Sequence, residues 1–118
     1  LYYTMIRHPP PHWVEFVYLA PYERFSRDEI PDKVERAFEA VIVENPEIGK
    51  LVPGLGGVRK VRVALPGHGK RGGARFLYFL RLARGRVYVL TAYAKNVQSD
   101  LTPDQRKRIL QTLEDLEG

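Results

Sequence analysis

The chain has 118 residues, enough for one domain with a hydrophobic core and too few for two. It contains no cysteine, which excludes disulfides and cysteine-ligated metal sites and fits a cytoplasmic protein. The net charge of +5 and the pI near 9.6 favour an anionic partner, and no apolar run is long enough to span a membrane.

The first segment in chain order is predicted to be an extended arm over residues 1–12. Three consecutive prolines, Pro9–Pro11, are incompatible with a helix there. His8 and His12 flank these prolines, but two histidines without a third ligand do not indicate a metal site, and we expect none. Residues 13–19 (WVEFVYL) predict a first strand.

A helix is predicted next, because Ser26–Glu29 has the pattern of a capping box and Pro31 is tolerated in a first turn. Pro46 should end it at Asn45, since the residue before a proline avoids helical geometry. The apolar stripe at helical spacing comprises Ile30, Val34, Ala37, Phe38, Val41 and Ile42. A turn-rich connector over residues 46–57 follows.

Three consecutive strands are predicted between Val58 and Lys95. Strand alternation turns Val61 to one face of the sheet, and Lys60 and Arg62 to the other. All fourteen acidic residues of the chain lie outside this segment, which is therefore purely basic. Such a charge distribution predicts a surface that binds phosphate.

The register between the second and third of these strands is predicted from their turn. A three-residue loop over residues 83–85 has Gly85 where a left-handed residue is needed. This loop places Arg75 opposite Tyr93, with Lys95 on the same face. A two-residue loop at residues 84–85 would instead turn Tyr93 and Lys95 to the other face, and the sequence leaves both registers open.

With the three-residue loop, one face carries four cations around a tyrosine, at a same-face spacing of about 6.6 Å along each strand. These residues are Lys60, Arg62, Arg75 and Lys95, with Tyr93 among them. Lys60 and Arg62 alone would be typical of a solvated strand face, and Tyr93 alone of half-buried packing. Four cations without an acidic partner repel one another, which favours an anionic ligand.

The loop between the first two of these strands contains Gly67, Gly69 and Gly72 at the spacing of a dinucleotide fingerprint. That fingerprint needs a helix after the loop, whereas a strand follows here, so a Rossmann fold is rejected. His68, Lys70 and Arg71 either belong to a solvated hairpin loop or reach toward a polyanion.

A C-terminal helix is predicted from Thr102, the cap, followed by Pro103 at the first helical position and Gln105 three residues after the cap. Its buried stripe comprises Ile109, Leu110, Leu113 and Leu116. The basic residues 106–108 are typical of a solvated face. The order of strand, helix, three-stranded meander and helix predicts an α+β fold.

Several motifs, in a fixed order over residues 45–105, resemble the HigB-like branch of the RelE/HigB toxins in the RelE/ParE superfamily. They are PEIGKLVPGLGGVRKVRV, GKRGGARFLYF, LTAYAKN and DLTPDQ. The resemblance implies one RelE-like toxin domain over residues 1–118. In that fold an antiparallel sheet, made of an N-terminal strand and a three-stranded meander, packs against helices, and a C-terminal helix follows.

The resemblance also implies a function. Toxins of this family belong to type II toxin–antitoxin modules, enter the ribosomal A site, cut messenger RNA there without metal or cofactor, and are neutralised by a helix-turn-helix antitoxin. We therefore expect a cytoplasmic endoribonuclease in a toxin–antitoxin hetero-oligomer, with no membrane partner. A non-catalytic RNA or ribosome binder, or a degenerate toxin that only pairs with its antitoxin, remains open.

The family's catalytic positions fall on Lys60, Arg62, Arg75 and Lys95, with Tyr93 beside the last. Two positions depart from the RelE pattern: Asn96 stands where RelE has an arginine, and Thr102 where it has a catalytic tyrosine. The general base therefore stays unassigned. Further RNA contacts are expected from Arg59, His68, Lys70, Arg71 and Asn96.

The residue types suggest roles in the attack of a 2′-hydroxyl on the neighbouring phosphorus. Arg62 and Arg75 suit the phosphorane oxygens, because a guanidinium binds two oxygens and keeps its charge. Like charges nearby favour the neutral form of a lysine, which makes Lys60 or Lys95 a candidate base. Tyr93 is expected either to act as an acid or to stack on an RNA base.

Overall fold

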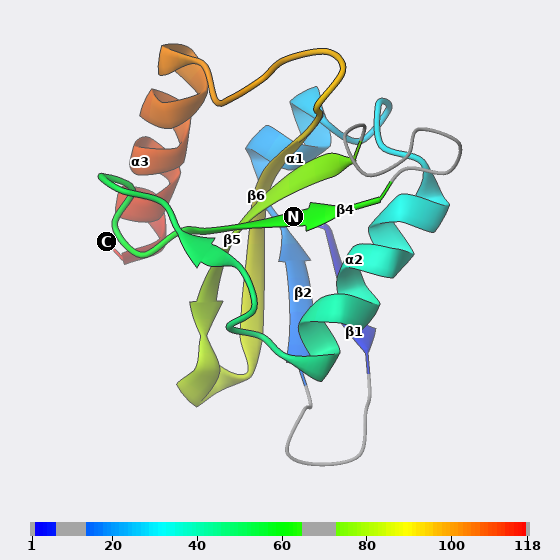
Figure 1. The fold of residues 1–118 in the computed structure, drawn as a ribbon. Helices are drawn as coiled ribbons and strands as arrows, with labels where there is room; N and C mark the ends of the chain where they lie inside the picture. Colours follow the sequence, from blue (N-terminus) through cyan, green and yellow to red (C-terminus); the bar gives the residue numbers. More distant parts are fainter. Residues whose placement is uncertain (1, 7–13, 65–72, 118) are drawn as a thin grey trace.

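The structure is a computed structural model that describes residues 2–6, 14–64 and 73–117. Within these ranges, six strands form one sheet in the order β1-β2-β6-β5-β4-β3 (Figure 1). The strands are β1 (Tyr2–Ile6), β2 (Val14–Tyr18), β3 (Lys50–Leu51), β4 (Arg59–Val63), β5 (Ala74–Arg81) and β6 (Arg86–Ala94).

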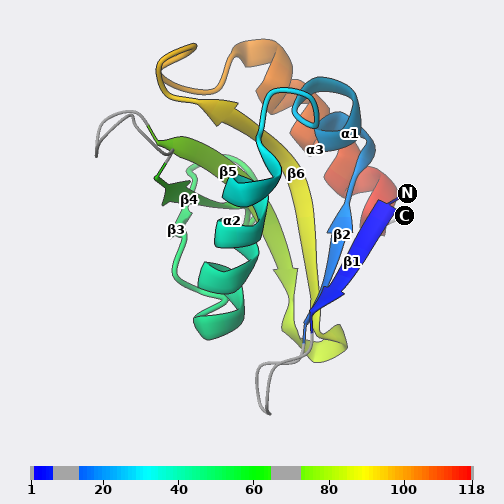
Figure 2. The same ribbon diagram turned by 90° about the vertical axis from the view of Figure 1, so that its right-hand side faces the viewer.

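Two long helices cover opposite faces of this sheet, α2 (Asp32–Glu44) on one and α3 (Pro103–Glu117) on the other (Figures 1 and 2). The short helix α1 (Ala20–Phe25) continues directly from β2 and packs against β6. A 3-10 turn, η1 (Leu82–Arg84), joins β5 to β6. No helix in the described part of the chain has the length and apolar character needed to cross a membrane.

The predicted α+β class is confirmed, but the sheet is mixed rather than wholly antiparallel. β6 lies between β5, to which it is antiparallel, and β2, to which it is parallel. The predicted arm is also partly wrong, because residues 2–6 form β1 and pair with β2. Side-chain patterns do not encode strand direction, so the sequence could not distinguish these pairings. Residues 7–12, including His8 and His12, lie outside the described residues.

The start of the long helix differs from the capping-box prediction. α2 begins at Asp32, with Pro31 as its N-cap, because a residue before proline, here Ile30, avoids helical geometry. Ser26 instead ends α1, and its buried hydroxyl donates to the carbonyl of Ala92 (2.9 Å) and accepts from the Ala92 amide (3.0 Å). Ser26 therefore fastens the end of α1 to β6.

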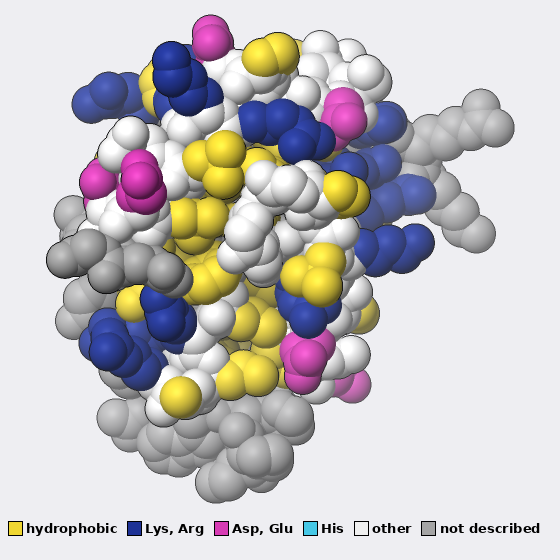
Figure 3. Space-filling view, turned by 90° about the vertical axis from the view of Figure 1, so that its left-hand side faces the viewer, with side chains coloured by type: hydrophobic (Ala, Val, Ile, Leu, Met, Phe, Trp, Pro, Cys, Tyr) yellow, Lys and Arg dark blue, Asp and Glu magenta, His cyan; other side chains and the backbone are white. Residues whose placement is uncertain are grey.

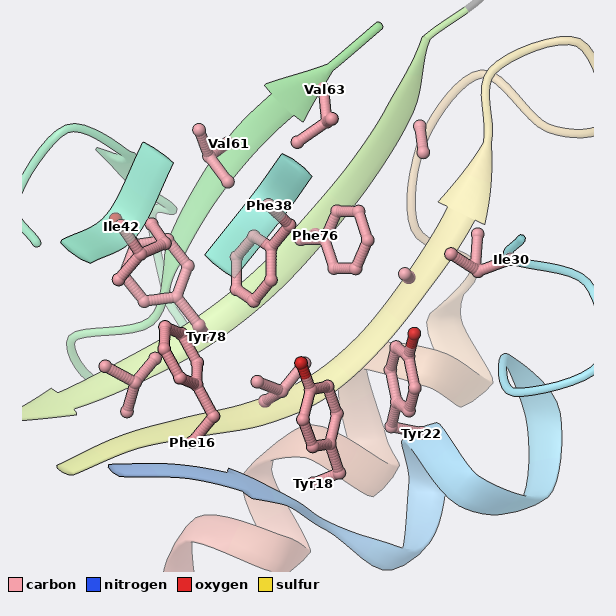
Figure 4. Close-up of a cluster of buried hydrophobic side chains, with 14 of the residues drawn as sticks. Phe16, Tyr18, Tyr22, Ile30, Phe38, Ile42, Val61, Val63, Phe76 and Tyr78 are labelled. Carbon is pink, nitrogen blue, oxygen red and sulfur yellow. The ribbon is translucent and has the colours of Figure 1, made fainter. Parts of the chain in front are cut away.

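The core beneath α2 is built on Phe38, which is fully buried (Figure 4). Its ring stacks on Phe76 of β5 at a centroid distance of 4.2 Å. It also meets Phe16 and Tyr78 edge-on, both at 5.9 Å. Because these rings come from α2, β2 and β5, burying them holds the helix to the centre of the sheet, at about 1.5–3 kcal/mol for each side chain buried.

Two glutamates of α2, Glu35 and Glu39, are buried against the same core. The hydroxyls of Tyr18 in β2 and Tyr22 in α1, drawn in red in Figure 4, satisfy them: Tyr22 donates to Glu35 (2.7 Å) and Tyr18 donates to Glu39. Arg27 pairs with Glu35 and lies over both tyrosine rings. Burial is the main cause that raises the pKa of Glu39 above its ordinary value.

The opposite face of the sheet forms a second core under α3. Leu77, Leu90 and Tyr93 of the sheet pack there with Ile109 and Leu113 of α3. The start of α3 agrees with the prediction. The Gln105 amide donates to the Thr102 hydroxyl (3.1 Å), and the Thr102 amide donates to the Gln105 side chain (2.9 Å), which completes a capping box.

At its open end, the β5–β6 hairpin has the predicted register, but the loop and the strand pairing that produce it differ from the prediction. Arg81, rather than Leu82, pairs with Arg86, so the loop is one residue longer than predicted, and Gly85 is left-handed (φ 61°) as expected. A β-bulge then leaves Leu90 without a partner in the ladder and shifts the register by one residue. Beyond the bulge, Arg75 lies opposite Tyr93 as predicted.

Glu39→Gln tests the effect of the buried carboxyl on stability. Because the native pKa of Glu39 is raised, the native state keeps the proton over a range in which the unfolded state has lost it. Wild-type stability should therefore fall, relative to the variant, as pH rises from about 4.3, the ordinary glutamate value, through the raised native pKa. Urea unfolding at several pH values measures this difference.

The matched control is Glu44→Gln, at an exposed position of the same helix. Its stability relative to wild type should change little over the same pH range. A wild-type chain that gains stability relative to Glu39→Gln as pH rises would contradict the assignment.

Candidate nucleic-acid interface

The ladder brings the predicted cations to the face of the sheet that carries α3. Arg62 of β4 pairs with Arg75 of β5, and Arg75 pairs with Tyr93 of β6. Their neighbours Val61 and Phe76 point into the core under α2, which fixes the arginines on the other side. We call Lys60, Arg62, Arg75 and Lys95 the basic face. Lys and Arg side chains gather along the right-hand edge of the view in Figure 3.

Gly73 allows the strands to meet closely at this end of the sheet. Its carbonyl accepts bonds from the Lys95 amide (3.0 Å) and from Nη1 of Arg75 (3.2 Å). A Cβ atom at Gly73 would lie 2.6 Å from the Val63 carbonyl oxygen, closer than any side chain tolerates. The absence of a side chain thus permits the approach that orients Arg75.

The two arginines at the centre have no acidic partner in the part of the chain that the structure describes. Among the described residues, no carboxylate pairs with Arg62 or Arg75, although they lie directly opposite each other in the ladder. Like charges at such positions destabilise a sheet by a few tenths of a kcal/mol to about 1 kcal/mol. The arrangement therefore suits an anion better than it suits the isolated protein.

The two lysines, by contrast, contact the loop between β6 and α3. Nζ of Lys60 lies 3.8 Å from the Asp100 carboxylate, and Nζ of Lys95 donates to the Ser99 carbonyl (2.8 Å). Both the Lys60 and Asp100 side chains are substantially exposed, and an exposed pair of this kind contributes about 0–1 kcal/mol. These contacts are therefore weak enough for a phosphate to replace.

Tyr93 is buried, with 3% of its surface exposed, so its ring cannot stack on an RNA base in this conformation. Its hydroxyl oxygen is the buried side-chain polar atom that lacks a hydrogen-bond partner within the described ranges. Burial raises the pKa of Tyr93, with Asp100 adding to the rise and Arg75 and Arg106 opposing it. The phenol therefore stays protonated near neutral pH.

Two residues near the site were not predicted. Asp100 brings a carboxylate to a face that was expected to lack one, and Arg106 lies close enough to Tyr93 to act on its pKa. Arg106 also donates to the Pro53 carbonyl at 3.4 Å. The signal available in the sequence was the short connection from Lys95 to Thr102, which returns the first turn of α3 to the end of β6.

Of the further RNA contacts predicted from the sequence, the structure describes Arg59 and Asn96. Arg59 faces away from the basic face and donates to the carbonyls of Glu47 (3.1 Å) and Gly49 (2.8 Å), because it alternates with Lys60 along β4. Asn96 is exposed and directly follows Lys95. His68, Lys70 and Arg71 lie outside the described residues.

The chain resembles known toxins in sequence and in fold. A family model described as the RelE toxin of the RelE/RelB toxin–antitoxin system matches residues 17–116. Among solved structures, the chain is similar to an arginine-to-alanine double mutant of E. coli toxin RelE in the free state, with a TM-score of 0.56. The match has 13% sequence identity and covers 83% of this chain and 95% of the RelE chain.

Tyr93→Phe tests whether the buried hydroxyl lacks a partner. Removing an unsatisfied buried hydroxyl should leave the free energy of unfolding unchanged or raise it by up to about 1 kcal/mol. Tyr78→Phe is the control, because the buried Tyr78 hydroxyl donates to the Pro46 carbonyl (2.8 Å) and accepts from the Gly49 amide (2.9 Å). That variant should lose about 1–3 kcal/mol. Equal losses in urea unfolding would contradict the prediction for Tyr93.

Proposed function

The chain belongs to the RelE toxin family of toxin–antitoxin systems, and on that basis we propose that it is a ribosome-dependent endoribonuclease that cuts messenger RNA in the ribosomal A site. The proposal places it in the HigB-like branch, in the cytoplasm, in a hetero-oligomer with a helix-turn-helix antitoxin. One observation supports the nuclease activity: Arg62 and Arg75 face each other across the ladder with no carboxylate of the described residues between them, and Lys60 and Lys95 lie beside them.

In the proposed reaction the RNA supplies its own nucleophile. The 2′-oxygen forms a bond to the adjacent phosphorus, the bond from phosphorus to the 5′-oxygen breaks, and the 2′-proton leaves while the 5′-oxygen gains one. Negative charge grows on the phosphorane oxygens during this step. Two guanidinium groups, Arg62 and Arg75, suit that charge because each binds two oxygens and neither loses its proton.

The proton transfers depend on groups at the edge of this arrangement. Tyr93, with its raised pKa, is protonated near neutrality and so is unsuited to act as the base; a lysine of the basic face is the candidate instead. Because no described residue is held in a position that makes it an evident base, the bound geometry of the RNA on the ribosome would supply much of the acceleration.

A second function, RNA or ribosome binding without cleavage, is favoured by a different observation. The Tyr93 hydroxyl is buried and Lys60 is paired with Asp100, so in the RNA-free protein one candidate catalytic group is inaccessible and another already has a partner. Cations alone would still bind the RNA backbone, with an affinity that falls as salt rises. Cleavage therefore separates the two functions.

Arg75→Ala tests the proposal. Induced expression of the wild type should arrest growth and produce new transcript 5′ ends within codons. The variant should lower the cleavage rate by about 10²–10³-fold, because it removes one charge that stabilises the transition state. Mapping of transcript 5′ ends measures the effect.

The control is Arg84→Ala, at an exposed position in the turn η1, at the other end of the β5–β6 hairpin. It removes the same charge and should cleave like the wild type. Salt-dependent RNA binding without transcript cleavage by the wild type would overturn the nuclease proposal in favour of the binding function.

A further inference from the structure

We propose that the loop over residues 96–102, between β6 and α3, occupies Lys60 and Lys95 of the basic face in the RNA-free toxin and moves away when RNA binds. This inference rests on the proposed RNA substrate. It assigns the loop an autoinhibitory role, in which the Asp100 carboxylate pairs with Lys60 where an RNA phosphate would otherwise bind.

The first observation is that this loop contacts two of the predicted site residues and shares a buried cluster with a third. Its Asp100 carboxylate lies 3.8 Å from Nζ of Lys60, and its Ser99 carbonyl accepts a bond from Nζ of Lys95 (2.8 Å). Leu101 packs in the same buried cluster as Tyr93. A carboxylate and a carbonyl thus satisfy ammonium groups whose proposed ligand is a phosphate oxygen.

The second observation is the hydroxyl of Tyr93. A buried hydroxyl without a hydrogen-bond partner is unusual in a folded protein and calls for an explanation. The groups that act on it, Arg75, Arg106 and Asp100, belong to the basic face or to the segment that follows β6. Leu101 of the loop belongs to the cluster that buries Tyr93, so movement of the loop would open a route by which RNA could bond to this hydroxyl.

The third observation is that the loop has the construction of a unit that can move. It begins with backbone turns, in which Val97 and Gln98 donate to the Ala94 carbonyl, and it ends at the capping box of α3. The Gln98 side chain bonds to the Asp100 carbonyl and to Gln105 (both 2.8 Å), so the loop is held mainly by its own contacts and by the start of α3. Among the described residues, its ties to the sheet are the two backbone bonds to Ala94 at the end of β6, the exposed lysine contacts and the packing of Leu101.

The chemistry of the exchange is electrostatic. In the RNA-free state, Asp100 lowers the positive potential around Lys60 and opposes the approach of a polyanion. A phosphodiester at Arg62 and Arg75 would repel that carboxylate and offer the lysines a competing anion. RNA binding should therefore open the loop rather than tighten it.

Hydrogen exchange of the full-length protein tests this directly, with a single-stranded 2′-O-methyl RNA as the probe, because it has no 2′-hydroxyl and is not cut. Amides of residues 96–102 should exchange several-fold faster with the RNA bound, including the Val97 and Gln98 amides, which donate to the Ala94 carbonyl of β6 in the free protein. Amides of β5 should exchange at the same rate or more slowly. Slower exchange of residues 96–102 in the complex would overturn the proposal.

Asp100→Asn provides the second readout. Asparagine keeps an oxygen that can accept the bond that the Leu101 amide donates to Asp100 (2.8 Å), so the turn is retained while the charge is lost. The variant should bind the RNA several-fold more tightly than the wild type at low salt and cut a transcript faster. Glu114→Gln, an exposed position farther along α3, removes one negative charge as well and should bind like the wild type.

Weaker or unchanged RNA binding by Asp100→Asn, with loss of cleavage, would mean that Asp100 takes part in the chemistry, and would overturn the proposed role of the loop.

These experiments distinguish a failure of the loop proposal from a failure of the proposed nuclease function. If the wild type cuts RNA while residues 96–102 become more protected from exchange, the proposed role of the loop is wrong and the nuclease proposal stands. If the wild type binds RNA without cutting it and residues 96–102 exchange faster in the complex, the nuclease proposal is wrong and the role of the loop stands.

Discussion

The repulsion between Arg62 and Arg75 is the constraint on which the candidate site depends. The ladder holds both guanidinium groups on one face, and no described carboxylate neutralises either of them. A fold selected for stability alone would place an acid or an apolar residue at one of these positions, because like charges directly opposite are unfavourable. The basic face is therefore best explained as a surface that binds a phosphodiester.

The fold carries this unfavourable arrangement because its stability comes from elsewhere. The stacked rings around Phe38 join α2 to the centre of the sheet, on the face opposite the arginines. On the near face, Leu77 and Ile109 anchor α3 beside the site without covering it completely. The two cores on opposite sides of the sheet therefore do not depend on Arg62 or Arg75.

Some of this could be predicted from the sequence, and the reasons for success differ between elements. The capping box at Thr102 is local, so its pattern identified the start of α3 correctly. The pairing of Arg75 with Tyr93 was also predicted, but the loop at Gly85 is one residue longer than expected and the bulge at Leu90 compensates for it. Side-chain alternation revealed the face of the arginines, whereas the bulge left no signal that could be read in advance.

Other features depend on contacts between distant segments and could not be predicted. Ser26 looked like a helix cap but bonds to β6, a strand more than sixty residues away in sequence. The carboxyl group of Glu39 is buried beside the apolar stripe of α2, and it is tolerated because the Tyr18 hydroxyl of β2 donates a hydrogen bond to it. Asp100 approaches Lys60 only after β4 and the β6–α3 loop come together. Each case needed the tertiary arrangement, which a pattern along the chain does not contain.

The most direct measurement is a crystal structure of the toxin with a single-stranded 2′-O-methyl RNA. The account predicts a phosphate between β4 and β5, with its oxygens within hydrogen-bond distance of both Arg62 and Arg75. RNA bound only on the α2 face, or both guanidinium groups left without a phosphate contact in the complex, would contradict it.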